Sequence, residues 1–289
     1  MANAVKSGYV RHGDNMLNYL EWGDESLPPL LLIHGLTGFA YSWRAVAERL
    51  SDHYRCIAMN LRGHGDSGPS PEREYSFPLH VTDVQKLLGE LGIGELPIVG
   101  HSLGGRVAIA YAAAHPERTK AIVVVDIAPG MTDEGAWGIK RGMDNTPAEF
   151  DSWEDALAFA SRMRPRELVE ERAAYIFRYL PSGKIAWKYD PLVREEWQGQ
   201  DLPPRARTHL WQELAAIRCP MLLIKGQDTN QLTPELCEQM VQNGPQSRWL
   251  EIPGTTHFVQ DDNLEGFLTE VEPFLAQVAG ATARPNVAR

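Results

Sequence analysis

The sequence predicts an α/β fold in which a mostly parallel, eight-stranded sheet carries helices on both faces and an inserted helical cap. Short apolar runs alternate with longer helical stretches along most of the 289 residues, as in chains built from strand–helix–strand units. Residues 29–35 and 120–129 are almost continuously apolar, which is typical of parallel strands buried on both faces. The alternation stops between about Met131 and Arg205, where a helical block interrupts it.

The expected elements follow one another in a regular order. The chain opens with a hairpin that turns at His12-Gly13-Asp14. Most of the later strands then lead into a helix, on both sides of the interrupting block. The expected strands are residues 7–12, 16–23, 29–35, 55–61, 96–102, 120–129, 219–226 and 247–254, and the expected helices are 42–52, 78–92, 102–115, 234–244 and 265–278.

The interrupting block is expected to form a cap on top of the sheet. Residues 149–165 and 166–181 have helical patterns, and residues 182–191 are rich in turn residues. The predicted organisation is a core domain in two parts, residues 1–130 and 206–278, a cap at 131–205 and a flexible tail at 279–289. Five of the eight tryptophans lie in the cap or in the helix that follows it: Trp137, Trp153, Trp187, Trp197 and Trp211. We expect them either to join the cap helices or to line an apolar substrate pocket.

Composition excludes several classes of function. The formal net charge of −10 argues against binding nucleic acid or an anionic membrane surface. The three cysteines, Cys56, Cys219 and Cys237, lack CxxC spacing, so we expect buried thiols rather than a disulfide or metal framework. The first residues lack the apolar core of a signal peptide, and no run approaches the ~18 apolar residues of a membrane span. We expect a cytoplasmic protein, whose oligomeric state the sequence leaves open.

Residues 98–118, IVGHSLGGRVAIAYAAAHPER, place a serine where an apolar strand turns into an alanine-rich helix. Ser102 could cap that helix, but capping leaves the neighbouring glycines unexplained. A sharp strand-to-helix turn makes the residue at its tip project its side chain, and Gly100 and Gly104 remove side chains that would collide there. Gly105 lets the helix approach the sheet. The G-x-S-x-G pattern therefore predicts a nucleophilic serine at the carboxyl edge of the sheet.

A serine hydroxyl needs a base to become a nucleophile, and His257 is the candidate. It lies in EIPGTTHFVQDDN, a loop after the last expected core strand, from which an imidazole could swing over the edge of the sheet. His34 and His64 are also near strand ends or loops. His101 is adjacent to Ser102 in the chain, and we expect its side chain to point elsewhere.

These segments resemble those of the α/β-hydrolase-fold serine hydrolases, in the small esterase-like group with a helical cap. The stretches LLLIHGLTG, NLRGHGDSG, VGHSLGG, VVVDIAP and IPGTTHFVQDDNLEGF occur in the family's order and cover nearly the whole chain. The resemblance implies the α/β-hydrolase fold, with Ser102 as nucleophile and His257 as base. It also implies an oxyanion hole formed by the backbone N–H groups of Leu36 and Leu103. Because these donors are backbone groups, we expect both side chains to vary freely.

The catalytic acid is the point at which the chain departs from this family. Many members carry it after the penultimate strand, but in KGQDTNQLTP the usual positions hold Thr229 and Asn230, and the carboxylate is Asp228. The alternative is Asp126, which ends IVVVD, a position that some esterase-like members use. Either residue gives the chain order Ser, Asp, His. We favour Asp126, because it ends a buried strand beside the nucleophile strand, and keep Asp228 as the alternative.

Two further loops receive structural interpretations. NLRGHGDSG carries Asn60 where the family has an aspartate, and we expect a glycine-rich turn that braces the rim of the site. Asp261 and Asp262 are expected to cap the N-terminus of the last helix. The sequence contains no phosphate-binding loop or dinucleotide fingerprint, so we expect no cofactor and no metal.

The leading hypothesis is a hydrolase of a carboxylic ester or a related small acyl compound, such as a thioester, lactone or activated amide, with an apolar or aromatic substrate. A carbon–carbon hydrolase of ring-cleavage products is the first alternative, since it would use the same residues. A non-catalytic small-molecule receptor on the same fold is the second. Serine at the tip of the turn argues against dehalogenase or epoxide-hydrolase chemistry, which needs aspartate there.

Overall fold

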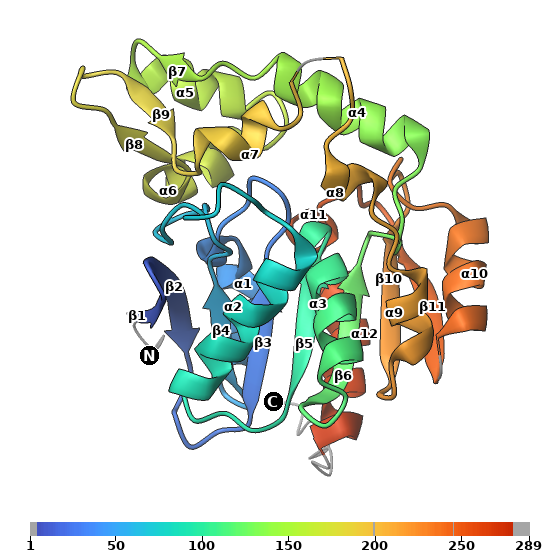
Figure 1. Cartoon of the computed structure of the whole chain (residues 1–289). Helices are drawn as coiled ribbons and strands as arrows, with labels where there is room; N and C mark the ends of the chain where they lie inside the picture. The colour runs from blue at the N-terminus through green and yellow to red at the C-terminus, as the bar shows by residue number, and fades with distance from the viewer. Residues whose placement is uncertain (1–4, 199, 245, 280–289) are drawn as a thin grey trace.

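The computed structural model describes residues 5–198, 200–244 and 246–279. Its main strands are β1 (Lys6–His12), β2 (Asn15–Trp22), β3 (Pro29–Ile33), β4 (Arg55–Met59), β5 (Leu96–His101), β6 (Thr119–Val125), β10 (Met221–Gly226) and β11 (Ser247–Ile252). They form one eight-stranded sheet in the order β1-β2-β4-β3-β5-β6-β10-β11 (Figure 1). The pairs β1–β2 and β2–β4 are antiparallel, and the other neighbours are parallel. The predicted fold class is confirmed.

Helices cover both faces of this sheet. They are α1 (Arg44–Leu50), α2 (Phe77–Glu90), α3 (Leu103–Ala114), α9 (Trp211–Ala216), α10 (Pro234–Asn243) and α12 (Leu264–Ala279). Apolar side chains of α2, α3, α9 and α10 join one core cluster with Ile122 and Val124 of β6. Those of α1 and α12 join a second cluster with Val123 and Val125. Successive side chains of β6 point to opposite faces of the sheet, so the core consists of two layers, one on each face.

Two expectations about local structure hold. The opening hairpin pairs His12 with Asn15 and turns at Gly13, whose φ is +59°. All three cysteines are free and buried. No helix in the described ranges is long and apolar enough to cross a membrane.

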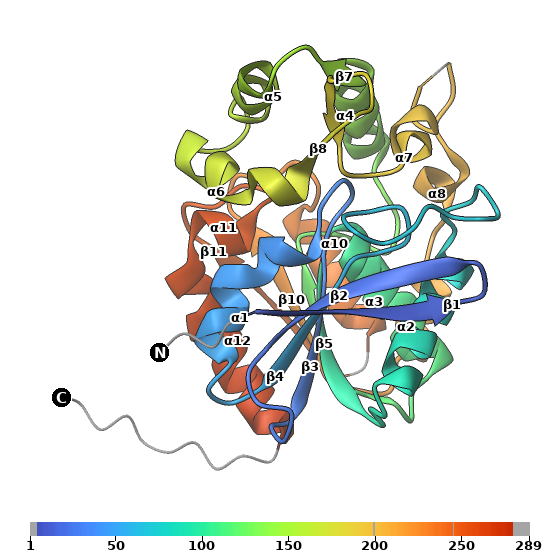
Figure 2. The same cartoon turned by 90° about the vertical axis from the view of Figure 1, so that its left-hand side faces the viewer.

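Between β6 and β10 the chain forms an insertion above the carboxyl ends of the strands (Figures 1 and 2). Its elements are α4 (Asp133–Asp144), β7 (Glu149–Phe150), α5 (Trp153–Ala160), α6 (Arg166–Ile176), β8 (Phe177–Tyr179), β9 (Ile185–Trp187), α7 (Pro191–Glu195) and α8 (Pro204–Arg207). The antiparallel sheet β7-β9-β8 corrects the expectation of helix and turns here. Aromatic and β-branched residues favour strands, and Gly183, with φ +84°, lets the hairpin close.

The insertion has an apolar interior of its own. Phe150, Leu157 and Phe177 are buried in it, with Trp153 and Trp187 packed against them. Trp197 is buried in a neighbouring cluster with Met143 of α4. These three tryptophans join elements of the insertion, whereas Trp137 is 40% exposed. Except for Ala279, which ends α12, the expected flexible tail lies outside the described residues.

Candidate active site

Ser102 occupies the tight turn between β5 and α3. Its φ of 53° and ψ of −119° are unusual for a non-glycine residue, and its hydroxyl does not cap the helix. A Cβ atom at Gly100 would lie 2.3 Å from the carbonyl oxygen of Gly104, and one at Gly104 would lie 2.2 Å from that of Ile33. Only glycine at these two positions lets α3 start so close to the strand ends. Ser102 is 8% exposed, and its hydroxyl has no hydrogen-bond partner in the described part of the chain.

His257 and Asp126 meet at the same edge of the sheet. The amide of Ser102 donates to the carbonyl of Val125 across β5 and β6, so Asp126 follows directly beside the nucleophile turn. Nδ1 of His257 lies 2.7 Å from Oδ2 of Asp126. The Asp126 side chain is fully buried and that of His257 is 24% exposed. If Nδ1 carries the proton for this bond, Nε2 remains free to accept one.

Two further groups hold the Asp126 carboxylate. The backbone N–H of Gly226 donates to Oδ1 over 2.9 Å, and the hydroxyl of Thr229 donates to Oδ2 over 2.5 Å. Asp126 also has a positive φ of 53°, a backbone conformation that a non-glycine residue adopts only where its surroundings impose it. Together with His257, these donors fix the orientation of the carboxylate.

The loop after β10 supplies those donors, but its own carboxylate lies elsewhere. Asp228 is exposed, and within the described residues its side chain makes no hydrogen bond. Buried Lys225 steadies the loop by donating to the carbonyls of Gly226 and Gln227 over 2.8 and 3.2 Å. It also forms a 2.8 Å ion pair with Glu251. Of the two candidate acids, the structure brings Asp126 to His257 and leaves Asp228 apart.

The expectation that the side chain of His101 points elsewhere is wrong, because it lies against His257 and supports the histidine loop. Its Nε2 donates to the carbonyl of His257 over 2.7 Å, and the two ring centroids are 4.7 Å apart. Burial lowers the pKa of His101 well below its usual value, and the neighbouring His257 adds to this. A neutral His101 therefore holds the loop without adding a positive charge.

The two expected oxyanion donors belong to segments that adjoin Ser102: Leu103 follows it in the chain, and a Cβ atom at Gly35, the residue before Leu36, would lie 3.1 Å from the Ser102 Cβ atom. Leu103 is the first residue of α3, so its N–H has no acceptor within the helix. Neither it nor the N–H of Leu36 makes a backbone hydrogen bond in the described part of the chain. His34 shapes the Leu36 loop: its ring donates to the carbonyl of Gly35 over 2.7 Å and accepts from the N–H of Leu61 over 3.0 Å. Burial lowers the pKa of His34 to about 4, so the ring is neutral at physiological pH.

The side chain of Leu36 is more constrained than expected. It packs against the core and against two clusters that belong largely to the insertion, which contain Trp197 and Val193. A change of size there would disturb the contact between core and insertion. The expectation that this side chain varies freely stays a prediction, and these packing contacts count against it.

Of the predictions for the Asn60 loop and for the segment with Asp261 and Asp262, the structure agrees with the first and contradicts the second. Buried Asn60 accepts a hydrogen bond from the N–H of Ala40 over 2.6 Å and donates to Asn18 over 2.7 Å, which agrees with a bracing turn. The aspartates near the last helix do not cap it. Asn263 does, since its Oδ1 accepts from the N–H of Gly266 over 2.8 Å. Asp262 instead accepts from the N–H and hydroxyl of Thr256 over 2.7 and 2.6 Å.

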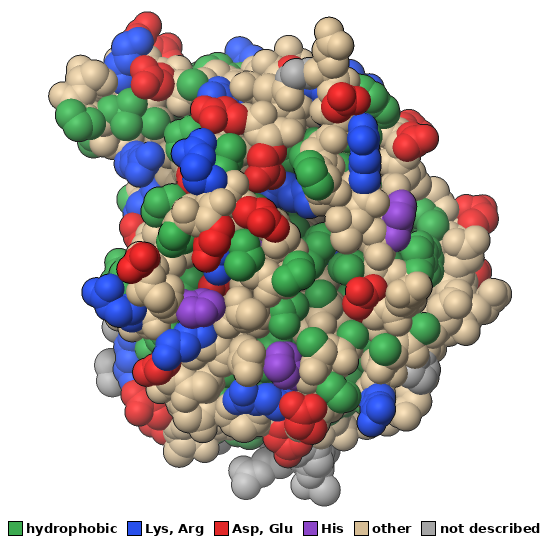
Figure 3. All heavy atoms as spheres, in the orientation of Figure 1, with side chains coloured by type: hydrophobic (Ala, Val, Ile, Leu, Met, Phe, Trp, Pro, Cys, Tyr) green, Lys and Arg blue, Asp and Glu red, His purple; other side chains and the backbone are tan. Residues whose placement is uncertain are grey.

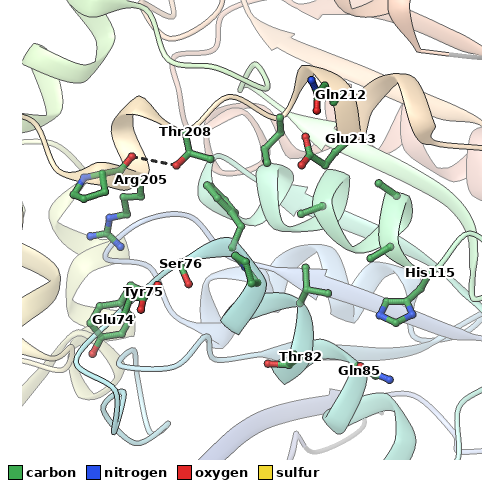
Figure 4. A pocket seen from close by; sticks show the side chains of 18 of the residues that line it. Glu74, Tyr75, Ser76, Thr82, Gln85, His115, Arg205, Thr208, Gln212 and Glu213 are labelled. Carbon is green, nitrogen blue, oxygen red and sulfur yellow. Dashed lines mark hydrogen bonds between the residues drawn. The ribbon is translucent and has the colours of Figure 1, made fainter.

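A separate groove of about 1020 Å³ lies on the outer side of α2, α3 and α9. Ala110, Ala113 and Ala114 of α3 form part of its lining, together with Thr208 and Glu213, which are labelled in Figure 4. Hydrophobic side chains gather over the middle of this face of the molecule (Figure 3). At about 1.5 Å per residue of helix, Ala110 lies roughly 12 Å along α3 from Ser102. No residue of the candidate active site lines this groove.

Comparison with known proteins identifies the family. A family model described as alpha/beta hydrolase fold matches residues 28–264, so the chain belongs to that family. The chain is 24% identical to a 3-hydroxybutyrate-oligomer hydrolase of Cupriavidus necator, over 89% of this chain and 93% of that protein. It is 27% identical to the esterase Rv0045c of Mycobacterium tuberculosis, over 85% and 82%. The crystal structure of E-2-(acetamidomethylene)succinate hydrolase superposes with a TM-score of 0.85 at 23% identity, covering 94% of this chain and 99% of that one. The protein is thus a hydrolase.

The candidate site combines several reactive and polar groups. It offers a hydroxyl on a projecting turn, an imidazole paired with a buried carboxylate, and two unpaired backbone N–H groups. In the described ranges, no three His, Cys, Asp or Glu side chains cluster as metal ligands would. Such a set can form a covalent intermediate and stabilise an oxyanion.

Proposed function

We propose that the protein is a serine hydrolase of carboxylic esters or related acyl compounds. The observation that carries the proposal is the 2.7 Å contact between His257 and buried Asp126, at the strand edge that also presents Ser102. Relatives named as an esterase and as an oligomer hydrolase, matched over most of their length, support the same reaction class.

In the proposed mechanism, Nε2 of His257 takes the proton of the Ser102 hydroxyl as its oxygen attacks the substrate carbonyl. Asp126 holds the imidazole in the required tautomer and stabilises the imidazolium that forms. The N–H groups of Leu36 and Leu103 bind the oxyanion of the tetrahedral intermediate. His257 then protonates the leaving group, and a water activated by the same imidazole releases the acyl group from Ser102.

Residues 131–205 are proposed to act as the cap that selects the substrate. The insertion lies over the strand ends that carry Ser102 (Figure 1), and its cluster around Trp197 touches Leu36. An apolar or aromatic acyl compound fits such surroundings, since ligand pockets are lined mainly by hydrophobic and aromatic side chains.

The test combines turnover with covalent labelling. The purified protein is given 4-nitrophenyl esters of increasing acyl length, and separately a 4-nitrophenyl alkylphosphonate that forms a stable adduct with an activated serine. We expect a burst of nitrophenol and one adduct per chain, both lost in Ser102→Ala. Ser26→Ala, which changes an exposed serine in the β2–β3 loop, should leave both unchanged. A folded wild-type protein with neither turnover nor adduct would contradict the proposal and favour the receptor hypothesis.

A further inference from the structure

Helix α6 of the insertion faces the core with three neighbouring side chains. Glu171 forms a 2.9 Å ion pair with Arg44 at the start of α1. Tyr175 stacks on Tyr41 of the short helix η1 (Ala40–Trp43), with ring centroids 3.9 Å apart and planes at 7°. Arg172 binds Asp261 in α11 (Val259–Asp262). Figure 2 shows α6 above both α11 and α1.

The contact at Asp261 is a three-residue ion-pair network in which only the Arg164 side chain, 23% exposed, reaches solvent appreciably. Arg172 donates to both carboxylate oxygens, over 2.8 and 3.1 Å, and Arg164, from the loop before α6, donates to Oδ2 over 2.5 Å. The side chains of Asp261 and Arg172 are only 5% and 7% exposed. Burial alone would raise the pKa of Asp261, but the two guanidinium groups outweigh it and hold that pKa below its usual value. We call Arg164, Arg172 and Asp261 the clasp.

The clasp is attached directly to the histidine loop. Asp261 lies four residues after His257, and the intervening Phe258 has the Arg164 guanidinium 3.2 Å from its ring centroid. Asp262 closes the loop on itself through Thr256. The 256–262 segment, which carries His257, is therefore short, internally hydrogen-bonded and tied at one end to the insertion.

The other contacts of α6 are with η1 and α1, the two helices that follow the Leu36 loop in the chain. Tyr41, on which Tyr175 stacks, lies five residues after Leu36, and Ala40 is bound to Asn60 through its N–H. One helix of the insertion is thus in contact with the segments that follow both the base and an oxyanion donor. Neither contact involves a residue that touches the reacting atoms.

We propose that the clasp couples the position of the insertion to the orientation of His257, which makes Arg164 and Arg172 positioning residues for the base. This inference rests on the proposed function of His257. When the insertion is seated on the core, the two arginines hold Asp261 and with it the histidine loop. When the contact is broken, the His257 ring is less well fixed against Asp126 and Ser102.

The test measures the rate at which the 4-nitrophenyl alkylphosphonate labels Ser102. Arg172→Gln and Asp261→Asn are each expected to slow labelling about tenfold while the fraction labelled at completion stays unchanged. The double variant should be no slower than the slower single variant, since both remove the same contact. Arg172→Lys, which keeps the charge, should be intermediate. The matched control is Arg166→Gln on the same helix, because Arg166 pairs only with exposed Glu154 and Glu170.

Rescue by the conservative variant separates positioning from general damage to the fold. Arg172→Lys keeps the positive charge beside Asp261, so it should label faster than Arg172→Gln, and both variants should reach the same final labelled fraction. A labelling rate in Arg172→Gln equal to that of Arg166→Gln would overturn the inference, as would a loss confined to the labelled fraction.

Hydrogen exchange keeps the inference testable without catalysis. Amides of residues 258–263 should exchange at least tenfold faster in Arg172→Gln than in Arg166→Gln, with β5 and β6 equally protected in both. If the wild-type protein is not labelled at all, the proposed function fails, and this comparison alone decides whether the clasp holds the loop. Equal exchange in the two variants would contradict it.

Discussion

Thr229 donates a 2.5 Å hydrogen bond from its hydroxyl to Oδ2 of Asp126, the oxygen that also contacts His257. Thr229 stands at one of the positions where the sequence pattern of many related hydrolases has the acid. In this chain the neighbouring strand β6 supplies the carboxylate, and the loop after β10 supplies a donor that orients it. The carboxylate that follows β6 is thus held in place by a donor that follows β10.

Thr229→Val should lower kcat/KM for a 4-nitrophenyl ester about tenfold. A hydrogen bond to a charged group contributes about 1.5–3 kcal/mol, and part of that fixes the carboxylate for the imidazole. Thr229→Ser restores the hydroxyl and should restore kcat/KM. Unchanged kinetics in Thr229→Val would show that the hydroxyl is dispensable.

Asp126→Asn should reduce kcat by up to ~10⁴-fold, because the amide no longer selects the tautomer or stabilises the imidazolium. Asp228→Asn should remain within about twofold of the wild type, since Asp228 is exposed and away from His257. Steady-state kinetics of the two variants measured side by side check this. A larger loss in Asp228→Asn would reverse the assignment of the acid.

Gly104→Ala should destabilise the protein by about 1–3 kcal/mol or more, because the added methyl group would meet two carbonyl oxygens at the end of β3. Gly89→Ala in α2 is the matched control, with no atom within 4 Å of the added Cβ. It should stabilise the helix by about 0.5–1 kcal/mol. Urea unfolding gives both free energies. Similar values for the two variants would mean that the turn at Ser102 is not tightly packed.

His80 should make stability fall in acid. Burial, followed by the nearby Arg205, lowers its pKa to about 3; both ring nitrogens lack partners in the described part of the chain. The unfolded chain binds a proton near pH 6.5, so stability is fully present above that pH and decreases as the pH falls towards 3. Between pH 7.5 and 5, wild-type protein should lose about 2 kcal/mol more than His80→Leu. Exposed His53→Leu should keep the wild-type slope in urea unfolding, and a parallel loss in His80→Leu would contradict the assignment.

The fold and part of the site can be predicted from sequence patterns, for physical reasons. Buried parallel strands are continuously apolar, and the turn at Ser102 needs glycines that stand out in the chain. The choice between Asp126 and Asp228 could not be settled in the same way, because it depends on which strand ends lie side by side. Thr229 and His101 stand at positions that the sequence analysis singled out, but their partners could not be predicted, since the contacts span 103 and 156 residues.

The insertion was harder to predict than the core. The two strands within residues 177–187 are short and contain aromatic side chains. In the sequence, such a strand pair looks like the end of a helix followed by turns. The partners of Asp261 lie 89 and 97 residues away, whereas a helix start lies directly after it. Local propensity therefore predicted that Asp261 caps the last helix. In the structure its carboxylate instead forms tertiary ion pairs with Arg172 and Arg164.

The closed apolar interior of the insertion, built around Phe150, Phe177 and Trp187, has a consequence for how such a protein diversifies. Substitutions among these side chains act mainly within one stretch of chain. The same insertion also contacts the core at several places, through α6, through Leu36 and through the hydrogen bond of Tyr75 to Asp190. A replacement insertion would therefore have to reproduce these contacts, whereas its apolar interior could differ.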